Sequence, residues 1–85
     1  MVQKDITLSP GAWQKAKSAA EFVQRALDFK SSVWVEKDDK KANAKSLLGL
    51  LALGIAPGAG VRLIADGADE DSAVAELGAF LTQSV

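Results

Sequence analysis

The side chain with the clearest chemical potential in this sequence is the hydroxyl of Ser46, and the most informative absences are those of histidine and cysteine. Without an imidazole, phosphohistidine transfer, histidine general-base catalysis and histidine-ligated zinc are excluded. Without a thiol, the chain has no disulfide and no cysteine-based metal site. The carboxylates show no spacing that supports acid–base pairing, and no glycine-rich phosphate loop is present. We therefore expect a protein that is not an enzyme, with no catalytic residues, no metal and no cofactor.

Ser46 precedes the uncharged run 47–53, which Gly54 and Pro57 follow. A serine before such a run, a glycine directly after it and a proline beyond predict a short helix over 47–53 that Ser46 caps. A phosphate added to Ser46 would be favoured by the free N–H groups at this helix end. The alternative is that Ser46 is a helix cap and nothing more.

Five leucines give this short helix two apolar faces. At about 100° per residue, Leu47, Leu48 and Leu51 share one side, whereas Leu50 and Leu53 point elsewhere. A two-turn helix in so small a domain cannot easily bury its whole circumference, and exposed apolar surface usually marks a contact site. We expect residues 47, 48 and 51 outside and residues 50 and 53 in the core. The alternative is that all five leucines are buried under a neighbouring loop.

Hydrophobic periodicity predicts the other elements that must position this helix. Alternating residues predict strands at 2–8, 33–35, 42–44 and 61–65, with Ile64 on the outer side of the last one. The apolar spacing from Ala19 predicts a helix that Ser18 and Glu21 begin as a capping box. The charged run 36–41 is typical of a solvated turn. The acids at 69–71 indicate the start of a last helix, where negative charge is favourable. The apolar residues at 73, 74, 77, 80 and 81 are expected to form its buried face.

The resulting order, βαββαβα, predicts an α+β fold in two layers, with helices on one face of an antiparallel sheet and a single domain over residues 1–85. The charge is uneven: residues 1–62 carry ten Lys/Arg against six Asp/Glu, giving +4, and residues 63–85 carry five acids alone, giving −5. The uncharged stretch 46–61 is too short and too rich in glycine to span a bilayer. The N-terminus shows no apolar signal region, so we expect a cytoplasmic protein.

A sheet backed by helices is also the plan of RNA-recognition modules, in which strand aromatics stack on bases. Trp34 is the only aromatic residue on a predicted strand, and the sequence pI near 5.2 gives weak attraction to phosphates. We expect Trp34 to pack in the core or at a sheet edge, and Trp13 to be a loop residue covering the start of the first helix. Direct reading of nucleic acid is therefore not expected.

The segment Asn43-Ala44-Lys45-Ser46-Leu47-Leu48-Gly49-Leu50-Leu51-Ala52-Leu53-Gly54, together with Ala19-Ala20-x-Phe22-Val23 and Gly67-x-Asp69-Glu70, resembles the HPr family of the bacterial sugar phosphotransferase system. Within that family it is most similar to the HPr-like catabolite repression proteins of bacilli. The resemblance runs essentially without gaps over residues 1–85. It implies an open-faced β-sandwich with a four-stranded antiparallel sheet and three helices on one face.

In the family's carriers, a Gly-Leu-His-x-Arg-Pro motif places the phosphorylated histidine at the start of the first helix. Here the stretch reads Trp13-Gln14-Lys15-Ala16-Lys17-Ser18. Lys15 therefore stands at the histidine position, Lys17 at the arginine and Ser18 at the proline. A lysine ammonium cannot relay phosphate as an imidazole does, so we expect no histidine-type phosphotransfer. The two lysines are either a solvated pair or a contact for a phosphate or an acidic partner.

Ser46 matches the residue that the ATP-dependent HPr kinase/phosphorylase modifies in the family. The resemblance implies that the phosphorylated form binds catabolite control protein A and serves carbon catabolite repression. The expected partner-binding residues are Lys15, Lys17, Lys45, Leu47, Leu48 and Leu51. A homodimer formed by exchange of the first strand stays open, as does the alternative of an HPr-like domain that has also lost phosphorylation and only binds proteins.

Overall fold

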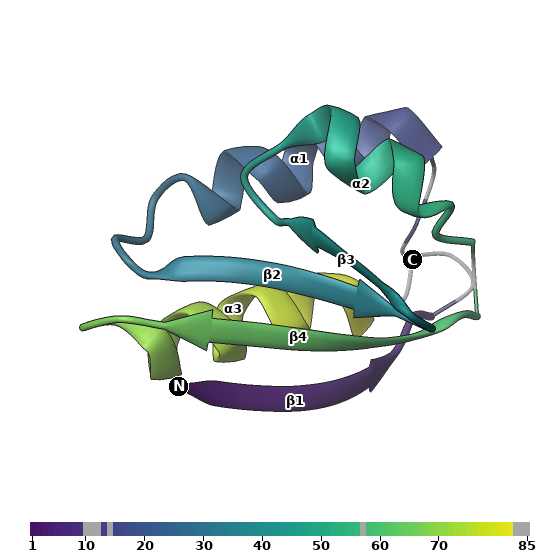
Figure 1. The fold of residues 1–85 in the computed structure, drawn as a ribbon. Coiled ribbons are helices and arrows are strands. Elements are labelled where there is room, and N and C mark those ends of the chain that lie inside the picture. Colours follow the sequence, from purple (N-terminus) through teal and green to yellow (C-terminus); the bar gives the residue numbers. More distant parts are fainter. Residues whose placement is uncertain (10–12, 14, 57, 83–85) are drawn as a thin grey trace.

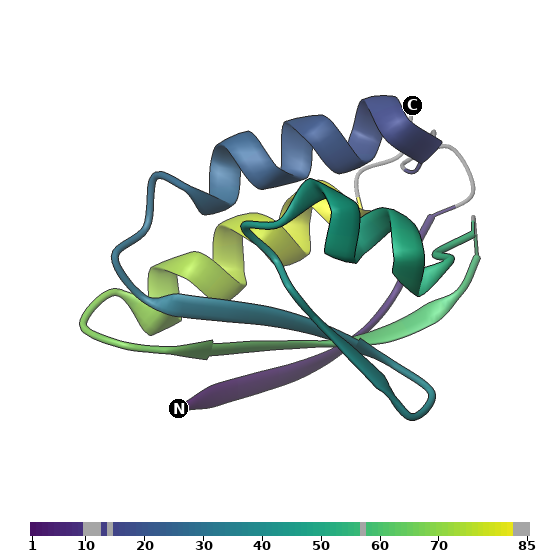
Figure 2. The ribbon, with the colours of Figure 1, turned by 45° about the horizontal axis from the view of Figure 1, so that its top comes forward.

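The computed structural model describes residues 1–9, 13, 15–56 and 58–82, with only the backbone of residues 15 and 16. The elements, in chain order, are β1 (Val2–Thr7), α1 (Lys15–Ala26), β2 (Ser32–Lys37), β3 (Lys40–Asn43), α2 (Leu47–Leu53), β4 (Gly60–Asp66) and α3 (Glu70–Thr82). The four strands form one antiparallel sheet in the order β1-β4-β2-β3, and the three helices lie on one of its faces (Figures 1 and 2). The predicted α+β class and element order are confirmed.

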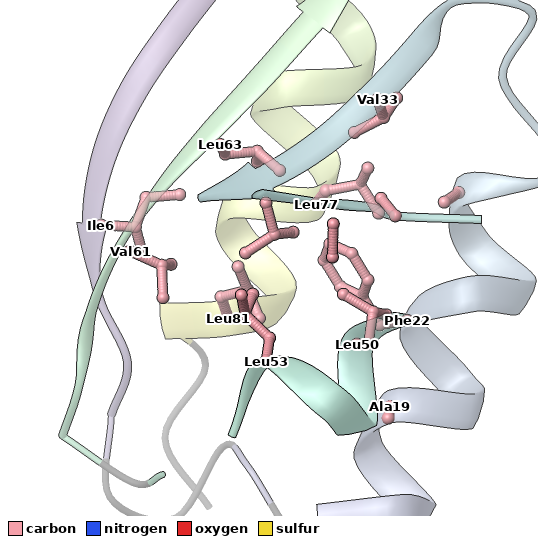
Figure 3. Close-up of a cluster of buried hydrophobic side chains, with 14 of the residues drawn as sticks. Ile6, Ala19, Phe22, Val33, Leu50, Leu53, Val61, Leu63, Leu77 and Leu81 are labelled. Atoms are coloured by element: carbon pink, nitrogen blue, oxygen red, sulfur yellow. The ribbon is translucent and has the colours of Figure 1, made fainter. Parts of the chain in front are cut away.

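The core fills the space between the sheet and the helix layer. Apolar side chains from all three helices meet the inner faces of the strands there, and Figure 3 shows ten of them by name: Ile6, Ala19, Phe22, Val33, Leu50, Leu53, Val61, Leu63, Leu77 and Leu81. Because the chain has no cysteine, this packing has to supply the stability that disulfides give to other small domains. No helix in the described part of the chain is long and apolar enough to cross a membrane.

The first helix begins one turn earlier than the predicted capping box. Helix α1 starts at Lys15, and Ser18 is buried inside it, only 6% exposed. Trp13 is buried just before the helix and packs edge-on against Phe22, with ring centroids 6.3 Å apart. This contact fixes the chain ahead of α1, and the helix-favouring residues 15–17 then continue the helix backwards past Ser18. The prediction of Trp13 as a loop residue at the start of the first helix is confirmed, and its burial is an addition of the structure.

The charged run 36–41 is mostly strand rather than turn. Strands β2 and β3 continue to Lys37 and Lys40, which face each other in the register, so that only two residues connect them. The first of these, Asp38, has a φ of 56°, which is the positive value that two-residue hairpins require. The predicted turn was therefore too long, because the tight hairpin extends both strands into the charged sequence.

The outer face of the sheet is partly apolar, contrary to the predicted place of Trp34. Trp34 is half-buried outside the core cluster and lies opposite Ile64 of β4, which is only 5% exposed. The ammonium of Lys41 lies 4.7 Å from the centre of the Trp34 ring, a cation–π contact. Because Val33 and Val35 take the inward positions of β2, the indole between them has to point to the other face.

Asp69, directly before α3, forms a tertiary contact that the sequence analysis missed. The Asp69 carboxylate accepts hydrogen bonds from the backbone N–H groups of Lys30 and Ser31, each at 2.9 Å, and from the buried Ser31 hydroxyl. The hydroxyl bond is the main cause that lowers the pKa of Asp69 to about 2. Gly67 has a φ of 153°, and a Cβ there would lie 2.6 Å from Ser31 Oγ, so the approach requires glycine. Asp69 therefore joins the start of α3 to the start of β2.

Candidate functional site

The site is built around helix α2, whose two ends are as predicted. Ser46 has extended backbone angles (φ −114°, ψ 110°), and its Oγ accepts a hydrogen bond from Gly49 N at 3.2 Å. The Ser46 carbonyl accepts from Leu50 N at 3.0 Å, which starts the helical pattern. At the other end, Gly54 has a φ of 72° and its N–H bonds the Leu51 carbonyl. The helix thus runs from residue 47 to 53, with Ser46 as its cap.

The residues between β3 and α2 hold Ser46 in place. Asn43 Oδ1 accepts from Lys45 N at 2.8 Å, and the Asn43 carbonyl accepts from Ser46 N at 3.0 Å, so the asparagine closes a tight turn. The Lys45 ammonium donates to the Phe29 carbonyl at 2.8 Å. These contacts tie the turn both to its own strand and to the segment that follows α1. The hydroxyl of Ser46 is therefore presented from a well-anchored position.

The predicted division of the leucines is confirmed. Leu48 is 81% exposed, with Leu47 at 39% and Leu51 at 43%, whereas Leu50 and Leu53 are 1% and 6% exposed. The three exposed leucines, here called the leucine patch, lie on the outer side of α2, and the two buried ones point into the core (Figure 3). An apolar side chain as open as Leu48 gains nothing from folding, so the patch is surface available for contact.

A hollow of ≈ 430 Å³ opens beside Ser46 and is lined by Lys40, Lys41, Ala42, Asn43, Ser46, Gly49, Ala52 and Leu53. Gly49 borders the hydroxyl so closely that a Cβ there would lie 3.3 Å from Ser46 Oγ. Ser46 and Gly49 therefore lie next to each other in the lining of the hollow. The sequence analysis missed the two lysines because it placed them in a solvated turn rather than on β3.

The three lysines predicted to bind partners differ in their surroundings. Lys17 is exposed on the first turn of α1, and Lys45 is half-buried with its ammonium on the Phe29 carbonyl. Lys15 begins α1, but its side chain lies outside the described part of the structure. Helices α1 and α2 pack against each other in the same layer (Figure 2). The structure thus brings together α1, which carries Lys15 and Lys17, and α2, which carries the three leucines. It gives Lys45, in the turn before α2, an internal contact that the sequence did not indicate.

The reactive group of this arrangement is the Ser46 hydroxyl. Within residues 1–9, 13, 15–56 and 58–82, no group of three or more histidine, cysteine or acidic side chains could hold a metal ion. The Ser46 hydroxyl is half-buried, anchored and open to the hollow, with an apolar patch on the adjoining helix. This is a place where added charge and apolar contact would lie side by side.

Comparison with known proteins identifies the family. The model for the PTS HPr component phosphorylation site matches residues 2–83. The HPr-like protein Crh of Bacillus subtilis is 44% identical over 85 residues, which is the whole of both chains. The phosphocarrier protein HPr of Neisseria meningitidis serogroup A is 39% identical over 77 residues, covering 91% of this chain and 86% of that protein.

Solved structures of HPr and Crh proteins support the same family. An HPr from Thermoanaerobacter tengcongensis superimposes with a TM-score of 0.86 at 41% identity, covering 95% of this chain and 91% of that one. A crystal structure of Bacillus subtilis Crh, described as an intertwined dimer with swapping, gives a TM-score of 0.76 at 42% identity, covering 95% and 93%. The chain therefore belongs to the HPr family of the phosphotransferase system, as a member that contains no histidine.

Proposed function

We propose that this HPr-like protein is a regulator whose Ser46 is phosphorylated by HPr kinase/phosphorylase, and that the phosphorylated form acts as a cofactor of catabolite control protein A in carbon catabolite repression. The observation that carries the proposal is the anchored, accessible Ser46 hydroxyl next to three exposed leucines. Two relatives named Crh, 44% and 43% identical, support the regulatory branch of the family over the carrier branch.

The modification step is a simple phosphoryl transfer. Ser46 Oγ forms a bond to the γ-phosphorus of ATP, the bond between that phosphorus and the ADP oxygen breaks, and the hydroxyl proton passes to a base of the kinase. The product carries about −1.5 to −2 charges where α2 itself carries none. The phosphate then lies at the hollow that Lys40 helps to line and at the start of the helix that carries the leucine patch, whereas the Lys41 ammonium is held over the Trp34 ring. A partner can therefore read a charge and an apolar surface together.

The same protein would not act as a histidine phosphocarrier or as an enzyme. No residue of the sequence can form phosphohistidine, and the position of the carrier histidine is taken by Lys15, a residue type that does not relay phosphate as an imidazole does. The roles proposed for Lys15, Lys17 and Lys45 are contacts to the partner proteins, with no cofactor and no direct reading of DNA. We place the protein in the cytoplasm, where the proposed kinase and regulator act.

Phosphorylation tests this function directly. Incubation with HPr kinase/phosphorylase and ATP should add one phosphate, detected by intact-mass spectrometry. The addition should be lost in Ser46→Asn, which keeps an oxygen to cap α2, and in Ser46→Ala, which does not. Ser72→Ala, at an exposed serine of α3, should behave as wild type. An unmodified wild-type chain would refute the proposal, and an acid-labile phosphate after incubation with enzyme I and phosphoenolpyruvate would contradict the absence of carrier function.

A second candidate is an HPr-like domain that binds proteins without being phosphorylated. The exposed leucine patch favours it as much as the switch does, because the patch needs no modification to make contact. The two candidates differ in the effect that phosphorylation of Ser46 has on the binding of catabolite control protein A. Equal capture of catabolite control protein A by modified and unmodified chains would support the binding domain, whereas capture of the phosphorylated chain alone supports the switch.

We also propose that the chain can form a homodimer by exchanging β1. Among the residues that the structure describes, β1 is an edge strand that pairs only with β4, through a register from Val2↔Ala65 to Thr7↔Gly60. An edge strand can make the same pairs with the β4 of a second copy, because in the described part of the chain no other strand pairs with β1. The intertwined dimer of the related Crh supports this possibility.

A further inference from the structure

The outer face of the sheet, the side turned away from the three helices, carries a row of charged side chains (Figures 1 and 2). The strand register places one charged residue of each strand in this row, and in the order of the strands they are Asp5, Arg62, Glu36 and Lys41. Arg62 Nε lies 2.9 Å from Asp5 Oδ1, and Arg62 Nη1 lies 3.6 Å from Glu36 Oε1, so these side chains share the face. The signs therefore alternate from β1 to β3.

A row of uncharged side chains runs beside the charged row, two residues away along each strand. In the same strand order its members are Gln3, Ile64, Trp34 and Asn43. An amide thus stands at each end and an apolar side chain on each central strand. Ile64 lies outside the core cluster, and Trp34 beside it is half-buried under the Lys41 ammonium. The outer face has an apolar centre that adjoins the alternating charges.

The remaining charges of this face lie beyond the two rows. Asp66 of β4 lies beyond the uncharged row, directly opposite Ser32, and its carboxylate is 3.6 Å from the amino group of Met1. Asp38, in the hairpin, lies beyond the charged row and lines a hollow of ≈ 330 Å³ together with Asp5, Glu36 and Arg62. The face as a whole therefore carries both signs, and the arrangement of the charges matters more than their sum.

The two rows are complementary to themselves under a twofold rotation about an axis that runs along the strands, between β4 and β2. In this arrangement β1 faces β3 of a second copy, and β4 faces β2. Asp5 then faces Lys41 of the second copy, and Arg62 faces Glu36. In the uncharged row the two amides face each other, and Ile64 faces Trp34. A twofold axis repeats each of these contacts once more, so the whole set is made twice.

A twofold axis across the strands does not have this property. An axis along the charged row would place Asp5 against Asp5 and Arg62 against Arg62, and juxtaposed like charges are costly. The axis along the strands also leaves Asp66 opposite Ser32, so no like charges meet beyond the uncharged row. It keeps the strands of the two sheets nearly aligned, which is the common way in which two sheets pack face to face.

From the register and the signs of the charges we infer that the outer face of the sheet is an interface between two copies of this chain, packed sheet against sheet. The contact differs from exchange of β1, because each copy keeps its own strand. It goes beyond the proposed function, which uses the helix side of the molecule. The helix layers of both copies stay uncovered, so the pair presents two Ser46 surfaces on opposite sides.

The size of the face makes this pair a weak one. Four strands about 4.8 Å apart, each with about five residues at ~3.3 Å, make a flat area on the order of 300 Å². A standard stable interface buries about 800 Å² per partner. The pair should therefore form only at high protein concentration and should dissociate rapidly. Because exposed charges contribute to it, salt should weaken it.

The first test uses the wild-type monomer isolated by gel filtration. ¹H–¹⁵N correlation spectra between ~0.05 and ~2 mM protein should show fast, saturable shifts at residues of both rows, including the Trp34 indole N–H, and no shifts on α1 and α2. Added salt at ~0.5 M should reduce the shifts. Exchange of β1 does not imitate this result, because an exchanged strand has to leave β4 before dilution can separate the copies.

The second test uses charge reversals at one of the inferred contacts. Asp5→Lys brings a lysine against Lys41 in both halves of the pair, and Lys41→Glu brings a glutamate against Asp5. Each variant alone should self-associate ~5-fold more weakly than wild type. An equimolar mixture of the two should recover association, and so should the double variant Asp5→Lys/Lys41→Glu, because opposite charges then meet again. Glu21→Lys and Lys17→Glu, the same reversals at exposed positions of α1, are the matched controls.

Spectra of the wild type that do not change with concentration, shifts confined to α1 and α2, or a mixture no stronger than the single variants would overturn the inference. Thermal midpoints confirm that the variants are folded, and the dilution series of the wild type needs no variant. Neither HPr kinase/phosphorylase nor catabolite control protein A takes part in these experiments. A failure of the inferred interface therefore leaves the proposed function intact, and a failure of Ser46 phosphorylation leaves the interface intact.

Discussion

At the scale of single residues, two oxygen-bearing side chains stabilise the starts of helices α2 and α3 in different ways. Ser46 accepts one local hydrogen bond, from Gly49 N, and remains accessible for chemistry. Asp69 accepts three hydrogen bonds from residues 30 and 31, which lie almost forty positions away in the sequence. A carboxylate with three donors is held in its ionised form, which is why its pKa falls. The Ser46 hydroxyl can therefore take part in a reaction that adds charge, whereas the Asp69 carboxylate is held in its ionised form.

The stability of the protein should therefore depend on Asp69 at low pH. Because the pKa is lowered from 3.8 to about 2 in the folded protein, the contribution is present above about pH 4 and is lost as the pH falls through 2. Asp69→Asn should lower the free energy of unfolding at pH 7, and the difference from wild type should shrink between pH 4 and pH 2. Urea denaturation across this range measures it. Asp71→Asn, at an exposed residue of the same helix, is the control, and a constant difference at all pH values would contradict the prediction.

At the scale of elements, the two faces of the short helix α2 have different roles. Its cap, its left-handed glycine and its two buried leucines hold it on the core, and its outer face is left uncovered. A seven-residue helix is too short to be stable by itself, so its stability comes from Leu50 and Leu53. Contact with partners and stability thus rest on different leucines of one helix.

Substitutions on the two faces should separate these roles. Leu48→Asp should change the free energy of unfolding by no more than about 0.5 kcal/mol, because the side chain is largely solvated, but it should weaken capture of catabolite control protein A by the phosphorylated chain. Leu50→Ala should cost about 2–5 kcal/mol. Chemical denaturation and a binding titration measure the two effects. A large loss of stability in Leu48→Asp would show that the outer face is packed.

At the scale of the whole molecule, the order of the sheet decides which parts can be exchanged. Strand β4 is central and joins residues 2–7 to residues 32–36, so the N-terminal strand and the hairpin meet only through it. The acidic C-terminal part of the chain also reaches back to the start, since Glu70 pairs with the amino group of Met1 at 3.0 Å. Both ends of β1 are therefore close to residues that a second copy could equally supply.

A cross-strand disulfide should report β1 exchange. Asp5 and Arg62 are direct partners on the outer face, and their ion pair at 2.9 Å is exposed, so replacing it should cost little stability. In Asp5→Cys/Arg62→Cys the two thiols are the only ones in the chain. Oxidised samples should run as covalent dimers on non-reducing gels if β1 is exchanged, and as monomers if it is not. Monomers alone, at every protein concentration, would refute the homodimer proposal.

Local patterns in the sequence were sufficient to predict most of the helices and strands, and α2 in particular. The signals that define α2 lie within a few residues of one another: a serine, an apolar run, a glycine and a proline. They therefore define the helix without reference to the rest of the chain. The leucine faces follow from helical geometry alone. The start of α1 could not be obtained in this way, because the burial of Trp13 against Phe22 overrides a capping motif that is valid on its own.

The sequence by itself determined the element order, the faces of α2, the cap at Ser46 and the loss of histidine chemistry, because each of these depends on residue type and short-range spacing. Only the tertiary structure decided that Asp69 binds Ser31, that Trp34 lies outside the core, that Lys40 and Lys41 line the hollow at Ser46, and that a row of alternating charges crosses the outer face of the sheet. The physical reason is common to all four. Each joins segments that are distant in sequence or depends on which face of the sheet a side chain takes, and packing decides both.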